Sequence, residues 1–186
     1  MRPTRRHRLL LWGAAIVVII ADQLSKLWVL NTVPEYATVD VFAWLRPILS
    51  FTRVTNTGVA FGMLPQFGEI FTVLPVVIVG VLVIFHRQLG LVGWLSHLAM
   101  GMQIGGALGN WIDRLMHGGA VVDFIDVNFW PFKSWPIFNL ADSAIVVGGT
   151  LLLIATWTQE MEDSAESEET LEPVPESSQQ RTLSDA

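Results

Sequence analysis

The 186-residue chain has the length of one domain but not the composition of a soluble one. Apolar residues make up 52% of the chain and are concentrated in long blocks. The chain has no cysteine, which excludes disulfides, thiol nucleophiles and cysteine-ligated metals. The net charge of −6 comes from the end of the chain, because residues 160–186 hold nine of the 17 acidic residues and only one of the 11 basic ones.

The first apolar block follows a basic start. Residues 2–8 (RPTRRHR) lead into about 22 mainly apolar residues, enough to cross a hydrocarbon core of about 30 Å. The beginning is similar to a secretory signal peptide, but the apolar character resumes after Asp22 and no small-residue cleavage site follows. We therefore expect an uncleaved span over residues 9–30. By the positive-inside rule, residues 1–8 are then in the cytoplasm.

Three further apolar blocks predict spans over residues 69–85, 91–111 and 137–157. Four spans with a cytoplasmic N-terminus also place the C-terminus in the cytoplasm, and they place the connections 31–68 and 112–136 outside. The tryptophans agree with this topology, because they fall at the two predicted boundaries as in an aromatic belt. Those at the outer boundary are Trp28, Trp44, Trp111, Trp130 and Trp135, and those at the inner boundary are Trp12, Trp94 and Trp157.

The outer connection 31–68 is too long for a simple link and predicts a small β-rich cap. Its segment ILSFTRVTNTGVAF alternates in part between apolar and polar residues and contains a turn signal at 56–58. Residues 158–186 are rich in Glu, Ser, Pro and Gln, so we expect a disordered acidic tail. The predicted fold class is an all-α membrane protein with four transmembrane helices, a small β-rich extracytoplasmic cap and cytoplasmic termini.

Polar residues from three spans are predicted to lie in one layer near the outer surface. Asp142, five residues into the fourth span, is only about 8 Å deep at a rise of 1.5 Å per residue. Carboxylates in or beside a membrane are costly and usually mark a functional site. The layer therefore predicts a single site. Its residues are Asp22, Lys26, Asn110, Asp113, Arg114 and Asp142.

Some of these residues also have structural explanations. Asp22 and Lys26 are four residues apart and can pair on one helical face, which favours an anchor between the first span and its neighbours. A glycine at every fourth position from 101 to 109 favours close packing of the third span. Arg114 can neutralise a nearby carboxylate or extend its side chain to the interface, and the sequence favours neither.

Two carboxylates in this layer can act together as an acid–base pair. Asp142 opens the fourth span, and the segment VVDFIDVNF offers Asp123 and Asp126, which face opposite sides of an extended strand. Spacing alone does not say which of these two faces the site. When two carboxylates share one proton, the ionised member activates water for attack on an amide carbonyl, and the protonated member donates to the carbonyl oxygen. Either member of the pair can be the base.

Other chemistries fit the sequence less well. The four histidines lie on both predicted sides of the membrane without metal-ligand spacing, so we expect no metal and no cofactor. A lysine-activated serine built on Lys26 is a weaker alternative. A proton-coupled transporter would place its ionisable groups near the midplane rather than in an outer layer. A non-catalytic scaffold would hold a partner helix against its glycine-rich faces and would function without the carboxylates.

Five motifs in one order, DQLSK, NTGVAFGM, GGALGNWIDR, VVDF and FNLADSA, resemble those of the bacterial lipoprotein signal peptidases (signal peptidase II) over residues 22–150. The resemblance implies a membrane aspartic endopeptidase that removes the signal peptide from diacylglyceryl-modified prolipoproteins. Such enzymes cut on the amino side of the lipidated cysteine. The resemblance assigns the catalytic pair to Asp123 and Asp142 and leaves Asp126 as a neighbour.

The resemblance also implies roles for other residues and a location. The positions that bind substrate or shape the site are Asn56, Gly58, Asn110, Arg114 and Asn139, and the supporting positions are Asp22, Lys26 and Asp113. The implied enzyme is a multi-pass protein of the bacterial cytoplasmic (inner) membrane with its active site near the extracytoplasmic face. Its partners are prolipoproteins and membrane lipids, not nucleic acid, and we expect a monomer.

Overall fold

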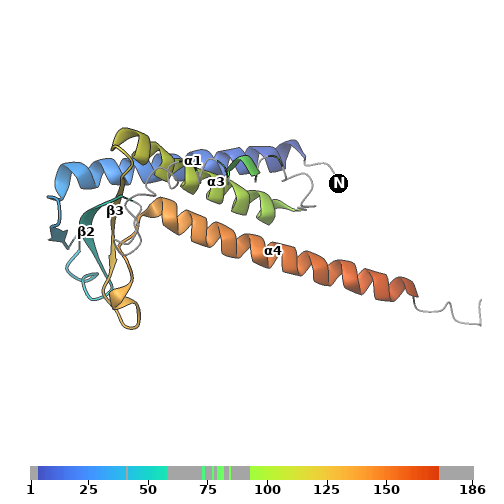
Figure 1. Cartoon of the computed structure of the whole chain (residues 1–186). Helices are drawn as coiled ribbons and strands as arrows, with labels where there is room; N and C mark the ends of the chain where they lie inside the picture. Colours follow the sequence, from blue (N-terminus) through green and yellow to red (C-terminus); the bar gives the residue numbers. More distant parts are fainter. Residues whose placement is uncertain are drawn as a thin grey trace, which may run out of the picture.

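Among the described residues, three long helices pack together and a small antiparallel sheet crosses their ends (Figure 1). The computed structural model describes residues 4–40, 42–57, 73, 77, 79–81, 84 and 93–171. The helices are α1 (Arg5–Thr32), α3 (Trp94–Met116) and α4 (Leu140–Leu171). The strands are β1 (Thr38–Val39), β2 (Leu49–Asn56) and β3 (Val121–Val127), and a turn of 3₁₀ helix, η3, covers Phe132–Ser134.

The helices match three of the predicted spans. The predicted spans 9–30, 91–111 and 137–157 correspond to α1, α3 and α4. Of the predicted span 69–85, the described residues 73, 77, 79–81 and 84 are helical. The rest of that span, together with Gly58, lies outside the described residues.

α1 and α4 have the character of membrane spans. In the part of the chain that the structure describes, the helices long and apolar enough to cross a membrane are Arg5–Thr32 and Leu140–Ser167, each with a mean hydropathy of 1.7. Large apolar side chains such as Val17 and Leu153 are exposed on their surfaces, as expected for helices that contact lipid. Polar residues and glycines occur along α3, and it packs against both α1 and α4.

Glycines allow the three helices to approach closely. A Cβ atom at Gly101 would collide with the backbone oxygen of Leu11 on α1, and one at Gly106 would collide with the backbone of Ala141 on α4. α4 contributes Gly148, where a Cβ atom would lie 2.8 Å from the carbonyl oxygen of Ala99 on α3. The packing role predicted for the glycines of the third span agrees with these contacts.

The sheet forms the cap but draws on a longer part of the chain than predicted. Its order is β1-β2-β3, and β2 pairs antiparallel with β3 in a register that places Val54 opposite Asp123. The predicted cap, 31–68, supplies β1 and β2, and β3 comes from the connection 112–136. The pattern within one segment cannot reveal this pairing, because the strand that pairs with β2 is distant from it in the sequence.

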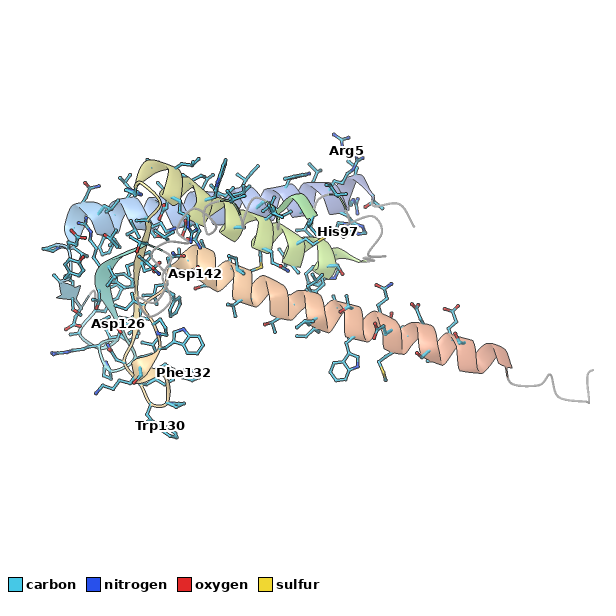
Figure 2. All side chains as sticks on the ribbon, viewed as in Figure 1. Arg5, His97, Asp126, Trp130, Phe132 and Asp142 are labelled. Carbon is cyan, nitrogen blue, oxygen red and sulfur yellow. The ribbon has the colours of Figure 1, made fainter. Side chains whose placement is uncertain are left out.

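The end of α1 fixes the sheet to the helices. Val29 and Val33 pack in one core with Val122 and Phe124 of β3. On β2, Arg53 donates from Nη1 to the carbonyl oxygens of residues 30 and 33, at 3.3 and 3.2 Å. These carbonyls are at the C-terminal end of α1, where helices lack internal donors. The loop after β3 extends to an exposed Trp130 at its tip (Figure 2).

The last helix continues further than the sequence predicts. α4 runs to Leu171, so the prediction of a disordered segment from residue 158 is wrong over residues 158–171. Glutamate, methionine, glutamine and alanine in this segment favour helix, and extending an existing helix avoids the cost of nucleation. Residues 172–186, which begin just before Pro173, lie outside the described residues.

Two neighbouring glycines of α4 offer a test of this packing. Changing Gly148→Ala should lower the stability of the folded protein by about 1–3 kcal/mol, because the new methyl group overlaps α3. Gly149→Ala is the matched control, since its Cβ atom would have nothing within 4 Å. Thermal unfolding midpoints in detergent micelles measure both. Equal midpoints for the two variants would contradict the close approach of α3 and α4.

Candidate active site

The first turn of α4 holds Asp142 in a fixed position. Asn139 is the N-cap, and its Oδ1 accepts a hydrogen bond of 2.9 Å from the backbone N–H of Asp142. In return, Oδ2 of Asp142 accepts from the backbone N–H of Asn139 at 3.3 Å. This reciprocal arrangement is a capping box, here built from Asn and Asp. The helix therefore begins at Leu140 rather than at residue 137, and its positive end faces the Asp142 carboxylate.

Asp123 projects from β3 toward the helices. Its side chain is 2% exposed and accepts two hydrogen bonds, one from Nδ2 of Asn56 at 2.8 Å and one from Nδ2 of Asn139 at 2.7 Å. Asp126 instead accepts from the hydroxyl of Thr52 at 2.7 Å, away from this site. The strand period left open whether Asp123 or Asp126 faces the site, and in the structure it is Asp123.

Two asparagine side chains connect the two carboxylates. Asn110 on α3 donates from Nδ2 to Oδ1 of Asp142 at 2.7 Å. Its Oδ1 accepts from Nδ2 of Asn139 at 3.0 Å, and Asn139 also contacts Asp123. Asn139 is fully buried. Asp123, from a strand, and Asp142, from a helix, are therefore held by one hydrogen-bonded chain.

The predicted pair of Asp22 and Lys26 is present and has a third member. The ammonium group of Lys26 lies 2.8 Å from Asp22 and 3.0 Å from Oδ2 of Asp113. The sequence placed Asp113 in the same layer but did not predict this second ion pair. Gln23 was not predicted at all. It donates from Nε2 to Asp113 at 3.0 Å, and its position next to Asp22 in an apolar span was the only available signal.

Arg114 adds a positive charge beside the carboxylates. Its Nη1 donates to the carbonyl oxygen of Asn110 at 3.2 Å, and its charge attracts those of Asp142, Asp123 and Asp113. The half-buried side chain therefore fits the first of its two predicted roles, neutralising nearby carboxylates. Its Nε is buried and has no hydrogen-bond partner among the residues that the structure describes.

Burial alters the acidity of Asp123. Removal from water raises the pKa of Asp123 to about 6, and the negative charge of Asp142 acts in the same direction. Hydrogen bonds from Asn56 and Asn139 and the charge of Lys26 act in the opposite direction without cancelling the effect of burial. A carboxylic acid in this environment keeps its proton well above the ordinary range for aspartate.

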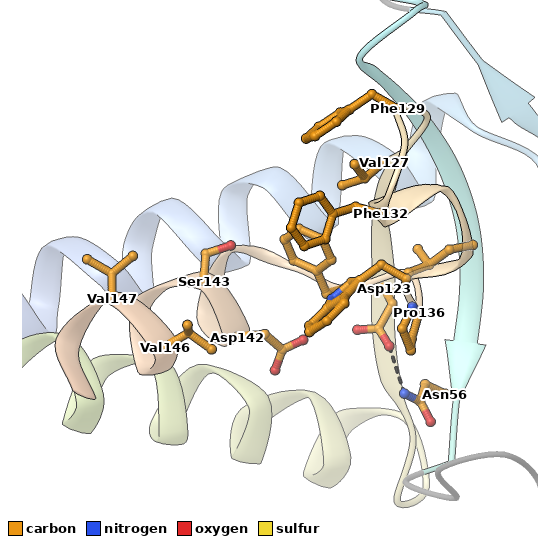
Figure 3. A pocket seen from close by; sticks show the side chains of 13 residues that line it. Asn56, Asp123, Val127, Phe129, Phe132, Pro136, Asp142, Ser143, Val146 and Val147 are labelled. Atoms are coloured by element: carbon orange, nitrogen blue, oxygen red, sulfur yellow. Dashed lines mark hydrogen bonds between the residues drawn. The ribbon is translucent and has the colours of Figure 1, made fainter. Parts of the chain in front are cut away.

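Both carboxylates line one cavity of about 630 Å³ (Figure 3). Asn56, Asp123 and Asp142 form its polar part. Most of its remaining wall is apolar and comes from the loop after β3 and from one side of α4. The sequence did not predict this wall, although the cluster of aromatic residues at 129–138 was a possible signal. The wall residues are Val127, Phe129, Phe132, Trp135, Pro136, Ile137, Phe138, Ser143, Val146 and Val147.

The predicted site positions that the structure describes gather around the two carboxylates. No group of three or more His, Asp or Glu side chains suited to a metal occurs within the described residues. Gly58, a predicted site position, lies outside that part of the chain. The other predicted positions, Asn56, Asn110, Arg114 and Asn139, all lie at or directly behind the two carboxylates.

Comparison with known proteins decides the family. The profile of the family described as signal peptidase (SPase) II matches residues 14–158. A lipoprotein signal peptidase from Shewanella halifaxensis is 42% identical over 156 residues, which are 82% of this chain and 88% of that relative. The chain belongs to the signal peptidase II family. Another relative, the lipoprotein signal peptidase of Halothermothrix orenii, is 39% identical over 145 residues, or 78% of this chain and 93% of its own.

Two solved structures have a similar fold. Each is described as a bacterial membrane enzyme, and they match with TM-scores of 0.69 and 0.68 at 33% and 34% identity. They cover 79% and 77% of this chain and 87% and 89% of their own chains. The resemblance of the five motifs is thus confirmed. The chain is an aspartic peptidase of the signal peptidase II type, a mostly helical membrane enzyme with a small antiparallel sheet.

The buried Asn139 offers a test of the hydrogen-bonded chain. Asn139→Ala should destabilise the protein by about 2–4 kcal/mol, because it removes the N-cap of α4 and leaves Asp123 and Asn110 each without one partner. Asn31→Ala is the control. Asn31 is exposed and, among the described residues, donates to the carbonyl oxygen of Leu27, so its loss should change stability by less than about 0.5 kcal/mol. Similar thermal midpoints for the two variants would rule out a central role for Asn139.

Proposed function

We propose that this chain removes the signal peptide from diacylglyceryl-modified prolipoproteins, cutting on the amino side of the lipidated cysteine. One observation carries the proposal: Asp123 and Asp142, from different elements, line one cavity and are connected through Asn139. The curated relatives, named lipoprotein signal peptidases, supply the class of substrate.

The surroundings of the two carboxylates give them different roles. Asp142 accepts hydrogen bonds from Nδ2 of Asn110 and from the backbone N–H of Asn139, and it lies at the positive end of α4. Asp123, with a pKa of about 6, is the member that retains a proton. We therefore assign Asp142 as the general base and Asp123 as the general acid.

The reaction follows from this assignment. Asp142 takes a proton from a water molecule, and the oxygen of that water forms a bond to the carbonyl carbon of the scissile amide. Asp123 gives its proton to the carbonyl oxygen, which yields a neutral tetrahedral intermediate. When the C–N bond breaks, the proton held by Asp142 passes to the leaving nitrogen, and a hydroxyl proton of the intermediate returns to Asp123. The products are a carboxylic acid and an amine, and the pair regains its starting protonation.

The rest of the cavity suits a lipidated peptide. Its apolar wall, which includes Phe132 and Trp135, provides a surface for acyl chains and for apolar residues of a signal sequence. The charge of Arg114 lies near the carboxylates, where it can attract a peptide carbonyl oxygen. Asn56 lies at the polar edge of the cavity, where it can hold the substrate backbone, and Asn110 shapes the site by its hydrogen bond to Asp142.

The proposed topology places this cavity near the extracytoplasmic face of the bacterial cytoplasmic membrane. Arg5, Arg6 and Arg8 begin α1, and Figure 2 shows Arg5 at the end of the bundle far from Asp142. Basic residues mark cytoplasmic ends, so the site lies toward the opposite face. Four spans, with both termini cytoplasmic and a monomeric chain among membrane lipids, complete the proposal. No metal, cofactor or nucleic acid takes part.

Carboxamide variants test the pair directly. Asp123→Asn and Asp142→Asn should each reduce cleavage by at least about 100-fold, since each removes an acid–base group. Asp126→Asn is the matched control, because this neighbour of Asp123 on β3 bonds to Thr52 instead of facing the cavity. The assay is cleavage of a synthetic lipidated prolipoprotein by purified protein. Near-normal cleavage by either of the first two variants would refute the assignment.

The pH dependence tests the role of Asp123. Because activity requires its protonated form, kcat/KM should fall as pH rises above about 6. Asn56→Ala removes a hydrogen bond that lowers the pKa of Asp123, so the alkaline limb should move to higher pH. Asn128→Ala is the control, since Asn128 donates to Arg46 and Ser50 instead. A limb that stays in place in Asn56→Ala, or moves to lower pH, contradicts the assignment of Asp123 as the acid.

A further inference from the structure

One buried lysine contacts three side chains that are hydrogen-bonded to the elements or side chains of the two aspartates. Lys26 is 2% exposed, and its ammonium nitrogen lies 2.8 Å from Asp22, 3.0 Å from Asp113 and 3.1 Å from Oδ1 of Asn110. An ammonium group has three N–H bonds, so these three acceptors use all of them. We call Lys26 with these three residues the Lys26 junction.

The two carboxylates of the junction hold the backbone beside the proposed catalytic residues. Oδ1 of Asp22 accepts from the backbone N–H of Ala141, at 3.0 Å, one residue before Asp142. Oδ2 of Asp113 accepts from the backbone N–H of Val122, at 2.9 Å, one residue before Asp123. Each carboxylate therefore joins Lys26 to the element that carries one member of the pair.

The third acceptor of the junction reaches the side chains themselves. Asn110 receives Lys26 on its Oδ1, which leaves its Nδ2 to point at Asp142. The same Oδ1 accepts from Asn139, whose amide also donates to Asp123. With an ammonium donor on Oδ1, the carboxamide of Asn110 has one favourable orientation, and that orientation presents N–H to Asp142.

An anchor between helices does not account for this arrangement. Asp22 is on the same helix as Lys26, and one contact with α3 would suffice to join the two helices, yet Lys26 contacts both Asp113 and Asn110 on α3. Two buried carboxylates on one ammonium leave a net negative charge in the junction, which is costly to bury. Such a cost is expected where geometry, rather than stability, is under selection.

We propose that Lys26 is a positioning residue that fixes the separation and orientation of Asp123 and Asp142 through Asp22, Asp113 and Asn110. The inference rests on the proposed function of the pair. Lys26 does not touch the substrate. It acts by holding α4, β3 and Asn110 in register, and by the field of its charge at Asp123, whose pKa it lowers. The charged groups around the junction and the pair, within the described residues, are Asp22, Asp113, Arg114, Asp123 and Asp142.

Two substitutions of Lys26 separate its charge from its geometry. Lys26→Met keeps the length of the side chain and removes the charge. We expect kcat to fall about 100-fold through misplacement of the pair, and the alkaline limb of the pH profile to move to higher pH because the pKa of Asp123 rises. Lys26→Arg keeps the charge, but a planar guanidinium cannot aim at three acceptors around one atom. It should lose activity while its alkaline limb stays close to that of the wild type.

A control and a second variant make the outcome clear. Lys133→Met makes the same change at an exposed lysine of the loop after β3, and it should alter neither kcat nor the pH profile. If Lys26→Met does not fold, Lys26→Met with Asp22→Asn removes one buried negative charge and should fold. The double variant should still show low kcat and a shifted alkaline limb, because no ammonium group then contacts Asn110 and Asp113.

The assay is cleavage of the synthetic lipidated prolipoprotein between pH 5 and about 9, with the folded fraction measured by thermal unfolding in detergent. Full activity in Lys26→Arg, or a loss in Lys26→Met that matches the loss of folded protein and leaves the limb unmoved, would overturn the inference. Failure of the wild type to cleave, or normal cleavage by Asp123→Asn, would instead overturn the proposed function. The two failures are therefore distinguishable.

Discussion

The need to satisfy buried carboxylates governs this structure. Asp22, Asp113 and Asp123 are each nearly or fully buried, and Asp142 is next to them. An ionised carboxylate away from water is costly unless charges and hydrogen-bond donors surround it. The chain meets this need with donors from each neighbouring element: an ammonium from α1, an amide from α3, and backbone N–H groups from α4 and β3. The arrangement of elements around the site follows from these bonds.

The helices and the sheet each position one of the two carboxylates. Glycines of α3 and α4 bring the helix backbones close together, so that Asp22 on one helix can reach the first turn of another. The sheet, tied to the end of α1 by Arg53, presents Asp123 from the other side. Two rigid elements thus each contribute one carboxylate to a common cavity. Acid–base chemistry benefits from this rigidity, because small displacements of catalytic groups reduce rates strongly.

Local patterns in the sequence predicted the helices and the polar layer, but they could not predict contacts between residues that are distant in the sequence. Apolar blocks located α1, α3 and α4, and the period of a strand placed Asp123 and Asp126 on opposite faces. Only the register with β2 and the reach of Asn139 show that Asp123 faces the site. Composition also misjudged residues 158–171, where an existing helix extends into polar sequence. The choice of Asp123 in the sequence rested on motif resemblance, not on geometry.

The central claim is that Asp123 and Asp142 act together on one reacting carbon. The most direct test is a crystal structure of the protein with a lipidated peptide analogue in which a hydroxyl-bearing tetrahedral carbon replaces the scissile carbonyl. Such an analogue imitates the tetrahedral intermediate. We predict that its hydroxyl oxygen lies within about 3 Å of both carboxylates, with the acyl chains against the apolar wall. A hydroxyl bound to one carboxylate alone, or bound outside the cavity, would contradict the account.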